Sequence, residues 1–270
     1  MSFATIQILL TRYKFTVLTL RMKNYLFGLL ILNFSLNSQA QTNQFISNKT
    51  TDSNTTTDKS PTIKNQHLLP LFGETTKSMQ QIEMDIKFLS DCDQNFESRT
   101  EASKFFSDRG WSYLQEGQLD TACYRFNLSW LLNNKNADCY WGLGVVCFQK
   151  GYLTDAERIL RKGIDIDSNN VGLLVDLATV DVIHFKESKD NWELQEADQL
   201  LSHALRVDST NATAYLKKAV LEYHKKNYDV SWRNLHKVKE LDITLLDFDF
   251  IRDLVECKPD PLGFFNAVKD

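Results

Sequence analysis

Two glycines one residue apart, Gly142 and Gly144, are the feature of this 270-residue chain that looks most like part of a nucleotide site. A glycine-rich loop binds phosphate when it follows a strand and opens a helix, because its backbone N–H groups then point at the anion. The surrounding sequence instead predicts a helix from about Asp138 to Lys150 that contains both glycines. Within a helix, a glycine lets a second helix approach closely. We therefore expect packing glycines and no nucleotide cofactor.

The other residues that could do chemistry do not form a catalytic pattern. None of the five histidines lies in an H-E-x-x-H sequence, and no G-x-S-x-G sequence occurs. Asp176 and Asp181 are five residues apart on a predicted helix, so their carboxylates do not share a face closely. We predict that the protein is not an enzyme and holds neither a cofactor nor a metal ion.

The five cysteines are too few and too scattered for a disulfide framework. No C-x-x-C pair occurs, and no cysteine lies near a histidine at the spacing of a zinc site. We expect the middle three to be small buried apolar side chains. A single bridge stays open in an oxidising compartment, but the sequence does not choose its partners. The five are Cys92, Cys123, Cys139, Cys147 and Cys257.

The charge balance excludes one class of partner. The chain has 31 basic and 35 acidic residues, a formal net charge of −4. Four of the basic residues lie within residues 1–40, which contain no acid, so the rest of the chain is more acidic than the whole. Nucleic-acid binding needs clustered Lys and Arg that displace counterions. We therefore predict no nucleic-acid partner.

The basic N-terminus has the layout of a secretory signal peptide. Residues 22–24 form a short basic segment, residues 25–36 are apolar, and Ser-Gln-Ala at 38–40 offers small residues at a cleavage site. We assign residues 1–40 to a signal peptide, expect Met22 to be the true start, and place the protein in the periplasm or cell envelope. An uncleaved N-terminal membrane anchor is the alternative.

A tether and a helix follow the leader. Residues 41–73 begin with a long stretch rich in Thr, Ser and Asn, which cannot bury enough apolar surface to fold. Residues 74–102 contain apolar side chains at three- and four-residue steps, which predict one face of a helix. These side chains are Met79, Ile82, Ile86 and Leu89.

Beyond residue 102 the sequence repeats with a period of 34 residues. Gly110 precedes Gly144 by this interval, and Ala178 follows Gly144 by the same interval. Asn136, Asn170 and Asn211 stand at equivalent points, where each can cap the helix that follows. A fixed period of this length, filled by two helices per unit, indicates an all-α helical solenoid.

The units resemble tetratricopeptide (TPR) repeats. The first supplies the small and aromatic residues of that pattern at Phe106, Gly110, Tyr113, Ala122 and Phe126, and the second at Tyr140, Leu143, Gly144, Ala156 and Leu160. On this resemblance, residues 103–245 form about four helix-turn-helix units. The third carries extra residues between its helices, around 188–194. Residues 246–270 form a C-terminal capping helix and tail. The chain is also similar to exported bacterial TPR proteins of poorly defined role.

The resemblance implies a groove lined by the first helix of each unit, which would bind a protein or peptide partner. The expected groove residues are mostly apolar, and aromatic side chains would anchor the partner. The protein would then be an interaction scaffold or assembly factor in the bacterial envelope. The groove residues are Trp111, Leu114, Trp141, Val145, Phe148, Val175, Val182, Leu216, Val220 and Tyr223.

Three alternatives remain open from the sequence. The chain's own residues 68–72, or the helix near Met79, could cover the groove. The protein could be a structural or self-associating subunit of an envelope complex that uses the same surface. A site for a reaction or a ligand could also lie at the insertion of the third unit, where His184, His203 and Trp192 stand.

Overall fold

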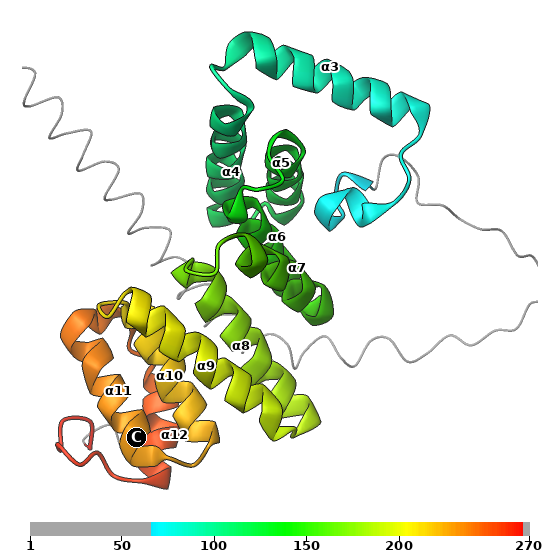
Figure 1. The fold of residues 1–270 in the computed structure, drawn as a ribbon. Coiled ribbons are helices and arrows are strands. Elements are labelled where there is room, and N and C mark those ends of the chain that lie inside the picture. The colour runs from blue at the N-terminus through cyan, green and yellow to red at the C-terminus, as the bar shows by residue number, and fades with distance from the viewer. Residues whose placement is uncertain (1–65, 267–270) are drawn as a thin grey trace, which may run out of the picture. The chain divides into compact units, whose positions relative to one another are not determined.

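The computed structural model describes residues 66–266, which contain α-helices and short 3₁₀-helices and no strand (Figure 1). The predicted signal peptide, and the tether as far as residue 65, lie outside the described residues. The described part divides into two compact units, which meet in sequence between Asp208 and Ser209. Within residues 66–266, no helix is both long and apolar enough to cross a membrane.

The first unit contains three consecutive helix pairs, α4 with α5, α6 with α7 and α8 with α9. Each second helix of the first two pairs also contacts the first helix of the next pair, and the first helices of neighbouring pairs contact each other. Contacts only between neighbouring pairs are the defining feature of a helical solenoid. The elements are η1 (Pro70–Glu74), α3 (Met79–Asn95), α4 (Arg99–Gln115), α5 (Leu119–Leu132), α6 (Ala137–Gln149), α7 (Leu153–Ile166), α8 (Val171–Ser188) and α9 (Asn191–Val207).

The second unit is one further helix pair closed by a terminal helix. It contains α10 (Ala212–His224), α11 (Tyr228–Leu241), η2 (Ile243–Leu245) and α12 (Phe248–Cys257). Ile251 and Leu254 of α12 are fully buried in a core that includes Trp232 and Leu235 of α11. The predicted fold class, an all-α solenoid of TPR type with a C-terminal cap, is confirmed.

Asparagine side chains start the first helices, as the sequence predicts. Asn136, Asn170 and Asn211 are the N-caps of α6, α8 and α10. Their Oδ1 atoms accept backbone N–H bonds from Asp138 at 3.1 Å, Leu173 at 3.1 Å and Ala214 at 2.9 Å. Each bond satisfies one of the N–H groups that have no partner within the helix.

The two glycines of the opening sequence lie inside α6, as predicted. A Cβ atom on Gly144 would lie 2.6 Å from the Leu160 side chain of α7, and one on Gly142 would lie 2.1 Å from the ring of Phe126 in α5. These distances are far below van der Waals contact. The glycines therefore allow α5, α6 and α7 to pack closely.

The extra residues of the third repeat are helical, which differs from the expected insertion between its helices. α8 has 18 residues and α9 has 17, whereas α6 has 13 and α7 has 14. Only residues 189 and 190 connect α8 to α9, and Lys189 takes a left-handed conformation there. The insertion lengthens both helices because its residues carry no helix breaker.

The middle three cysteines are buried as expected, and Cys92 is buried as well. Cys123, Cys139 and Cys147 are almost completely inaccessible, and all five thiols of the chain are free. Burial raises the pKa of Cys123 and of Cys147 to about 12, so these thiols stay protonated at neutral pH. They act as small apolar side chains in the helix interfaces.

We predict that Gly144→Ala lowers the free energy of unfolding by about 1–3 kcal/mol, because the added methyl group would overlap Leu160. Alanine favours a helix more than glycine does, so a loss would show that packing outweighs propensity. Urea denaturation followed by circular dichroism measures the change. In the double variant Gly144→Ala/Leu160→Ala the loss should be smaller than the sum of the two single losses. Additive losses would contradict the contact.

Candidate partner-binding surface

The ten predicted groove residues all lie on first helices, and we call them the first-helix strip. In the compact unit that contains α4 to α9, Trp141 is half-buried and the other six strip residues are buried. In the second unit, Leu216 is buried, and Val220 and Tyr223 are half-buried. A partner therefore has direct access only to the three half-buried side chains, Trp141, Val220 and Tyr223. The other seven become accessible only if neighbouring residues move.

Two tryptophans of the strip connect consecutive helix pairs. The ring centroids of Trp111 and Trp141 are 4.6 Å apart in an edge-to-face arrangement. Trp111 donates its indole N–H to Asp138 of α6 at 3.1 Å, and Trp141 donates its own to Asp176 of α8. Each indole thus bonds to the first helix of the next pair. These aromatic side chains hold the stack together, in addition to any contact with a partner.

One polar group of α6 has no partner. The Nε2 atom of Gln149, next in sequence to the strip residue Phe148, is buried and makes no hydrogen bond with any residue that the structure describes. A buried amide N–H that lacks an acceptor is costly, and such groups are rare in folded proteins.

The segment before α3 does not lie along the strip but is docked on the second helices α5 and α7. The fully buried side chain of Asn127 donates to the backbone carbonyl groups of His67 at 3.1 Å and of Leu69 at 2.8 Å. Phe72 is buried with its ring centroid 6.4 Å from that of Trp130. The carboxylate of Glu74 pairs with two cations of α7, Arg158 and Lys162. We call residues 66–74 and their α5–α7 contacts the clasp.

The sequence does not predict the clasp. From the sequence, residues 68–72 are an alternative cover for the strip. Asn127 cannot be recognised as a binding residue, because a single asparagine in an apolar helix belongs to no characteristic sequence pattern. The Pro70-Leu71-Phe72-Gly73 sequence is the one available signal, since Pro and Gly mark a turn.

A polar cluster lies where α7, α8 and α9 meet. Arg161 of α7 pairs with Glu157 of its own helix and with Glu196 of α9. Asp181 of α8 is 1% exposed; one of its oxygens lies 4.0 Å from Arg161, and the other has no hydrogen-bond partner among the described residues. Burial raises the pKa of Asp181 to about 8, and the negative charge of Glu196 contributes to the same shift.

The residues of the third repeat that could form a separate site do not converge. His184 lies 3.4 Å from Glu157, and His203 bonds to Asn169 at 2.9 Å, so the two histidines have different partners. Trp192 is half exposed at the start of α9. Within the described part of the chain, no three His, Cys, Asp or Glu side chains are placed to hold a metal ion.

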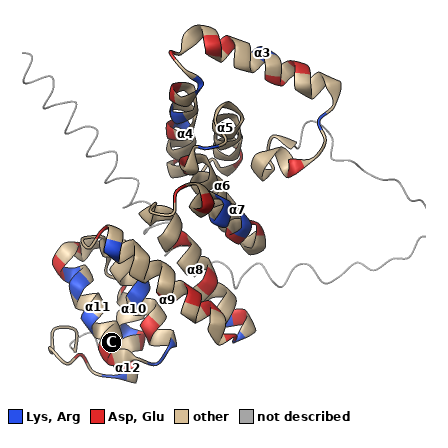
Figure 2. Cartoon of the chain, in the orientation of Figure 1, with Lys and Arg blue, Asp and Glu red and all other residues tan. Residues whose placement is uncertain are grey.

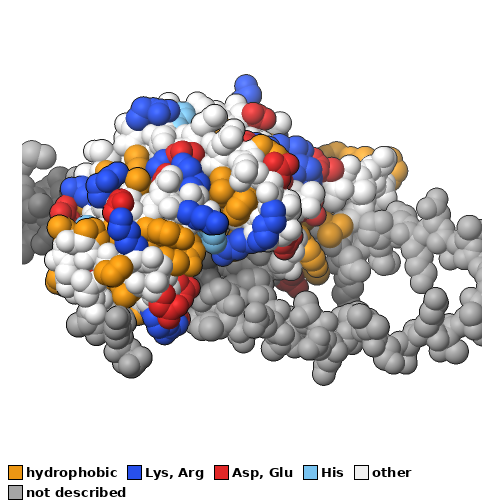
Figure 3. Space-filling view, turned by 90° about the horizontal axis from the view of Figure 1, so that it is seen from below, with side chains coloured by type: hydrophobic (Ala, Val, Ile, Leu, Met, Phe, Trp, Pro, Cys, Tyr) orange, Lys and Arg blue, Asp and Glu red, His pale blue; other side chains and the backbone are white. Residues whose placement is uncertain are grey.

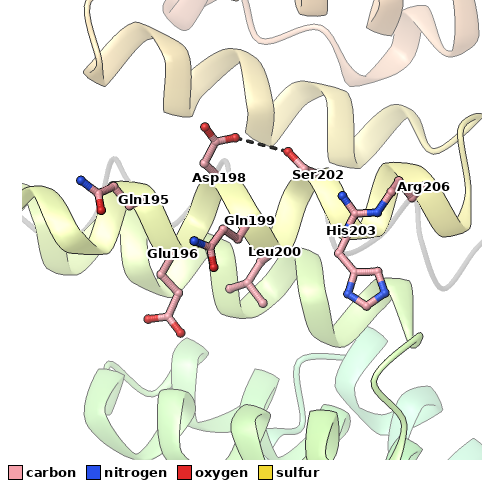
Figure 4. A pocket seen from close by; sticks show the side chains of 8 residues that line it. All are labelled: Gln195, Glu196, Asp198, Gln199, Leu200, Ser202, His203 and Arg206. Carbon is pink, nitrogen blue, oxygen red and sulfur yellow. Dashed lines mark hydrogen bonds between the residues drawn. The ribbon is translucent and has the colours of Figure 1, made fainter.

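The surface of the described units is mixed in character. Acidic and basic residues are scattered among uncharged ones along the helices (Figure 2), and apolar side chains lie among charged ones on the face in Figure 3. An open hollow is lined by eight residues of α9, among them Gln199 and His203 (Figure 4). The polar contact drawn there joins Ser202 to Asp198 at 3.4 Å. These side chains come from one helix and do not converge on a common point.

The stacking of consecutive helix pairs decides the fold type, and the chain is similar to several solved structures. The structure of PilF from Pseudomonas aeruginosa matches with a TM-score of 0.52 at 19% identity, covering 63% of this chain and 74% of that one. A thermophilic TPR protein of Thermus thermophilus matches with a TM-score of 0.49 at 15% identity, covering 62% and 98%. This chain has the tetratricopeptide-repeat fold. YrrB, described as a TPR protein with an unusual peptide-binding site, matches at 0.44 and 16%, covering 67% and 96%. No protein-family model and no curated protein matches the TPR chain.

We predict that Trp141→Phe costs more stability than Trp111→Phe. Each change removes one indole N–H bond, but Asp176 is buried whereas Asp138 is half-buried. A hydrogen bond to a buried carboxylate contributes more than one to a half-buried carboxylate, and the loss for Trp141→Phe should be about 1.5–3 kcal/mol. Chemical denaturation of both variants measures the difference. Equal losses would contradict the assigned roles of the two carboxylates.

We predict that Asp181 makes the protein less stable as the pH rises. The pKa of this group is about 8 in the folded protein, above its ordinary value of 3.8, so the folded state binds more protons between those two values. The stability that the protonated form contributes is therefore lost progressively as the pH rises through about 8. Asp181→Asn should remove this loss, so its gain over wild type should be larger at about pH 8.5 than at about pH 5.5. Thermal unfolding at both pH values measures it, and a gain that is the same at both would contradict the assignment.

Proposed function

We propose that the protein is a non-catalytic protein–protein interaction scaffold of the bacterial envelope, which holds a segment of a partner protein against its first helices. The TPR fold supports the general role, because stacked helix pairs form an extended surface with no need for a reaction centre. The partner is a protein or peptide, and the function includes no catalytic step.

The observation that carries the proposal is the unpaired amide of Gln149, together with the half-buried ring of Trp141 on the same helix. Gln149 as a whole is only half-buried, so its side chain can turn outward and donate to the backbone of a partner that crosses α6. Trp141 would supply apolar contact beside it, and tryptophan is enriched among the residues that dominate binding energy. The two residues are eight positions apart, about two helical turns, and so lie toward the same side of α6.

The envelope location rests on the leader. Residues 22–40 combine a basic start, an apolar stretch and small residues before a cleavage point. The Thr-, Ser- and Asn-rich residues that follow would then act as a spacer between the point of cleavage, or an anchor, and the helical stack.

We predict that Gln149→Leu abolishes partner capture and leaves the fold stable. Leucine has a similar size and removes the unsatisfied N–H group, so the free energy of unfolding should stay the same or rise by about 1–2 kcal/mol. The measurement is chemical crosslinking of the full chain in native envelopes, followed by identification of the captured proteins.

The matched control is Gln199→Leu, the same change at an exposed position of α9. It should capture the same proteins as wild type. Capture that is unchanged in Gln149→Leu would contradict a binding site on α6. Capture that is lost only in Gln199→Leu would place the partner on the hollow of α9.

A further inference from the structure

The clasp has the composition of a complete peptide-binding site. Its docking surface on α5 and α7 supplies a buried amide donor from Asn127, an aromatic neighbour from Trp130, and two cations from Arg158 and Lys162. The bound segment presents backbone carbonyl groups, a buried phenyl ring and one carboxylate to these groups in turn. Main-chain recognition, an apolar pocket and a charge pair are the three elements of specific binding to an extended segment.

The bound segment is held in a conformation that it would not adopt alone. Leu71, Phe72, Gly73 and Glu74 have φ values of 52°, 55°, 74° and 52°, all in the left-handed region. For residues other than glycine this conformation is unfavourable, because it brings the Cβ atom too close to the following carbonyl oxygen. The contacts with α5 and α7 must therefore outweigh this cost. The surface of α5 and α7 therefore binds residues 66–74 in the way that a protein binds a peptide ligand.

Ionisation of Glu74 favours the same contacts. Burial by itself would raise the pKa of this carboxyl group, but the hydrogen bonds and charges of Lys162 and Arg158 outweigh burial and hold the pKa below its ordinary value. Glu74 is therefore negatively charged at neutral pH. A change of its sign should oppose docking.

Residues 66–95, the docked segment together with α3, form what we call the arm, and α3 connects the clasp to the stack. Its C-terminal half packs on α4, where the ring of Phe88 lies 5.3 Å from that of Phe106 and Cys92 is buried. Its N-terminal half leaves Met79 73% exposed and Ile86 61% exposed. Figure 1 shows α3 crossing from its junction with α4 toward η1. The arm is thus attached at both ends, and the apolar face between them has no cover within the described residues.

We propose that two copies of this chain exchange their arms, so that residues 66–74 of each copy occupy the α5–α7 site of the other. The occupant is known, because the same segment fits the same site within one chain. Every contact of the clasp is regained after exchange, which is why swapping identical elements is a low-cost route to a dimer. The hinge is the short connection of residues 96–98, between α3 and α4.

The exposed face of α3 supplies the additional stabilisation that a dimer needs. In the exchanged dimer the two arms run beside each other, and Met79, Ile82 and Ile86 of one arm pack against the same residues of the other. Removing this apolar surface from water favours association. The dimer surface differs from the first-helix strip, so an exchanged dimer would keep the strip for its partner.

A charge exchange between chains tests the proposal. In Glu74→Arg the arm repels the site, and in Arg158→Glu/Lys162→Glu the site repels the arm. The three side chains are each more than a third exposed, so the folded stack should tolerate these changes. Each variant alone should be monomeric by light scattering, whereas the wild type should approach twice its monomer mass as concentration rises. An equimolar mixture should form dimers that contain one chain of each kind. In such a dimer the Glu74→Arg arm meets the negative site of the other chain, and the unaltered Glu74 arm meets the unaltered Arg158 and Lys162, so both contacts are attractive.

The triple variant Glu74→Arg/Arg158→Glu/Lys162→Glu is the control, since it restores charge attraction between arm and site and should dimerise as the wild type does. Circular dichroism checks that all variants are folded. A wild type that stays monomeric at every concentration would overturn the proposal, and so would a mixture that stays monomeric while the triple variant dimerises. Ile86→Glu should weaken the dimer about tenfold or more and leave the clasp charges intact. A dimer unaffected by Ile86→Glu would show that the arms do not pack together.

Discussion

The ring of Phe126 fills the space beside two glycines that belong to consecutive helix pairs, and the stack depends on this fit. A Cβ atom on Gly110 of α4 would lie 2.7 Å from the ring, and one on Gly142 of α6 would lie 2.1 Å from it. Phe126 itself is fully buried on α5. One side chain therefore joins a helix to its own partner and to the next pair, and a repeat unit cannot bury such a ring alone.

A buried polar network reinforces the same junction. Asn136, the N-cap of α6, donates from its amide group to the hydroxyl groups of Ser103, Ser107 and Ser129 at 2.9–3.2 Å. These hydroxyl groups also bond to one another, so α4, α5 and the start of α6 share one set of hydrogen bonds. Because buried polar groups are costly when unpaired, this network favours a single relative position of the three helices.

The two sides of the stack make different contacts. On the first helices, the tryptophans bond to the next pair and one amide, that of Gln149, is left without an acceptor among the described residues. On the second helices, the amide group of Asn127 donates to the chain's own segment. In the proposed function and the proposed exchange, the partner and the arm use different surfaces, so the two interactions do not compete.

The helices, their caps and the period of the stack follow from the sequence alone, because these depend on interactions between residues close together in the chain. Small residues 34 positions apart, and asparagines before each of three first helices, predicted pairs that the structure confirms. The sequence did not determine where the extra residues of the third repeat lie. Residues that favour a helix can lengthen the two helices of the repeat or form a loop between them. Three features depend on how the helices pack in three dimensions. Trp111 and Trp141 bond between repeats, the amide N–H of Gln149 has no acceptor among the described residues, and residues 66–74 dock on α5 and α7. Those bonds join residues roughly 30 to 90 positions apart in the chain, and their geometry follows from the relative placement of whole helices.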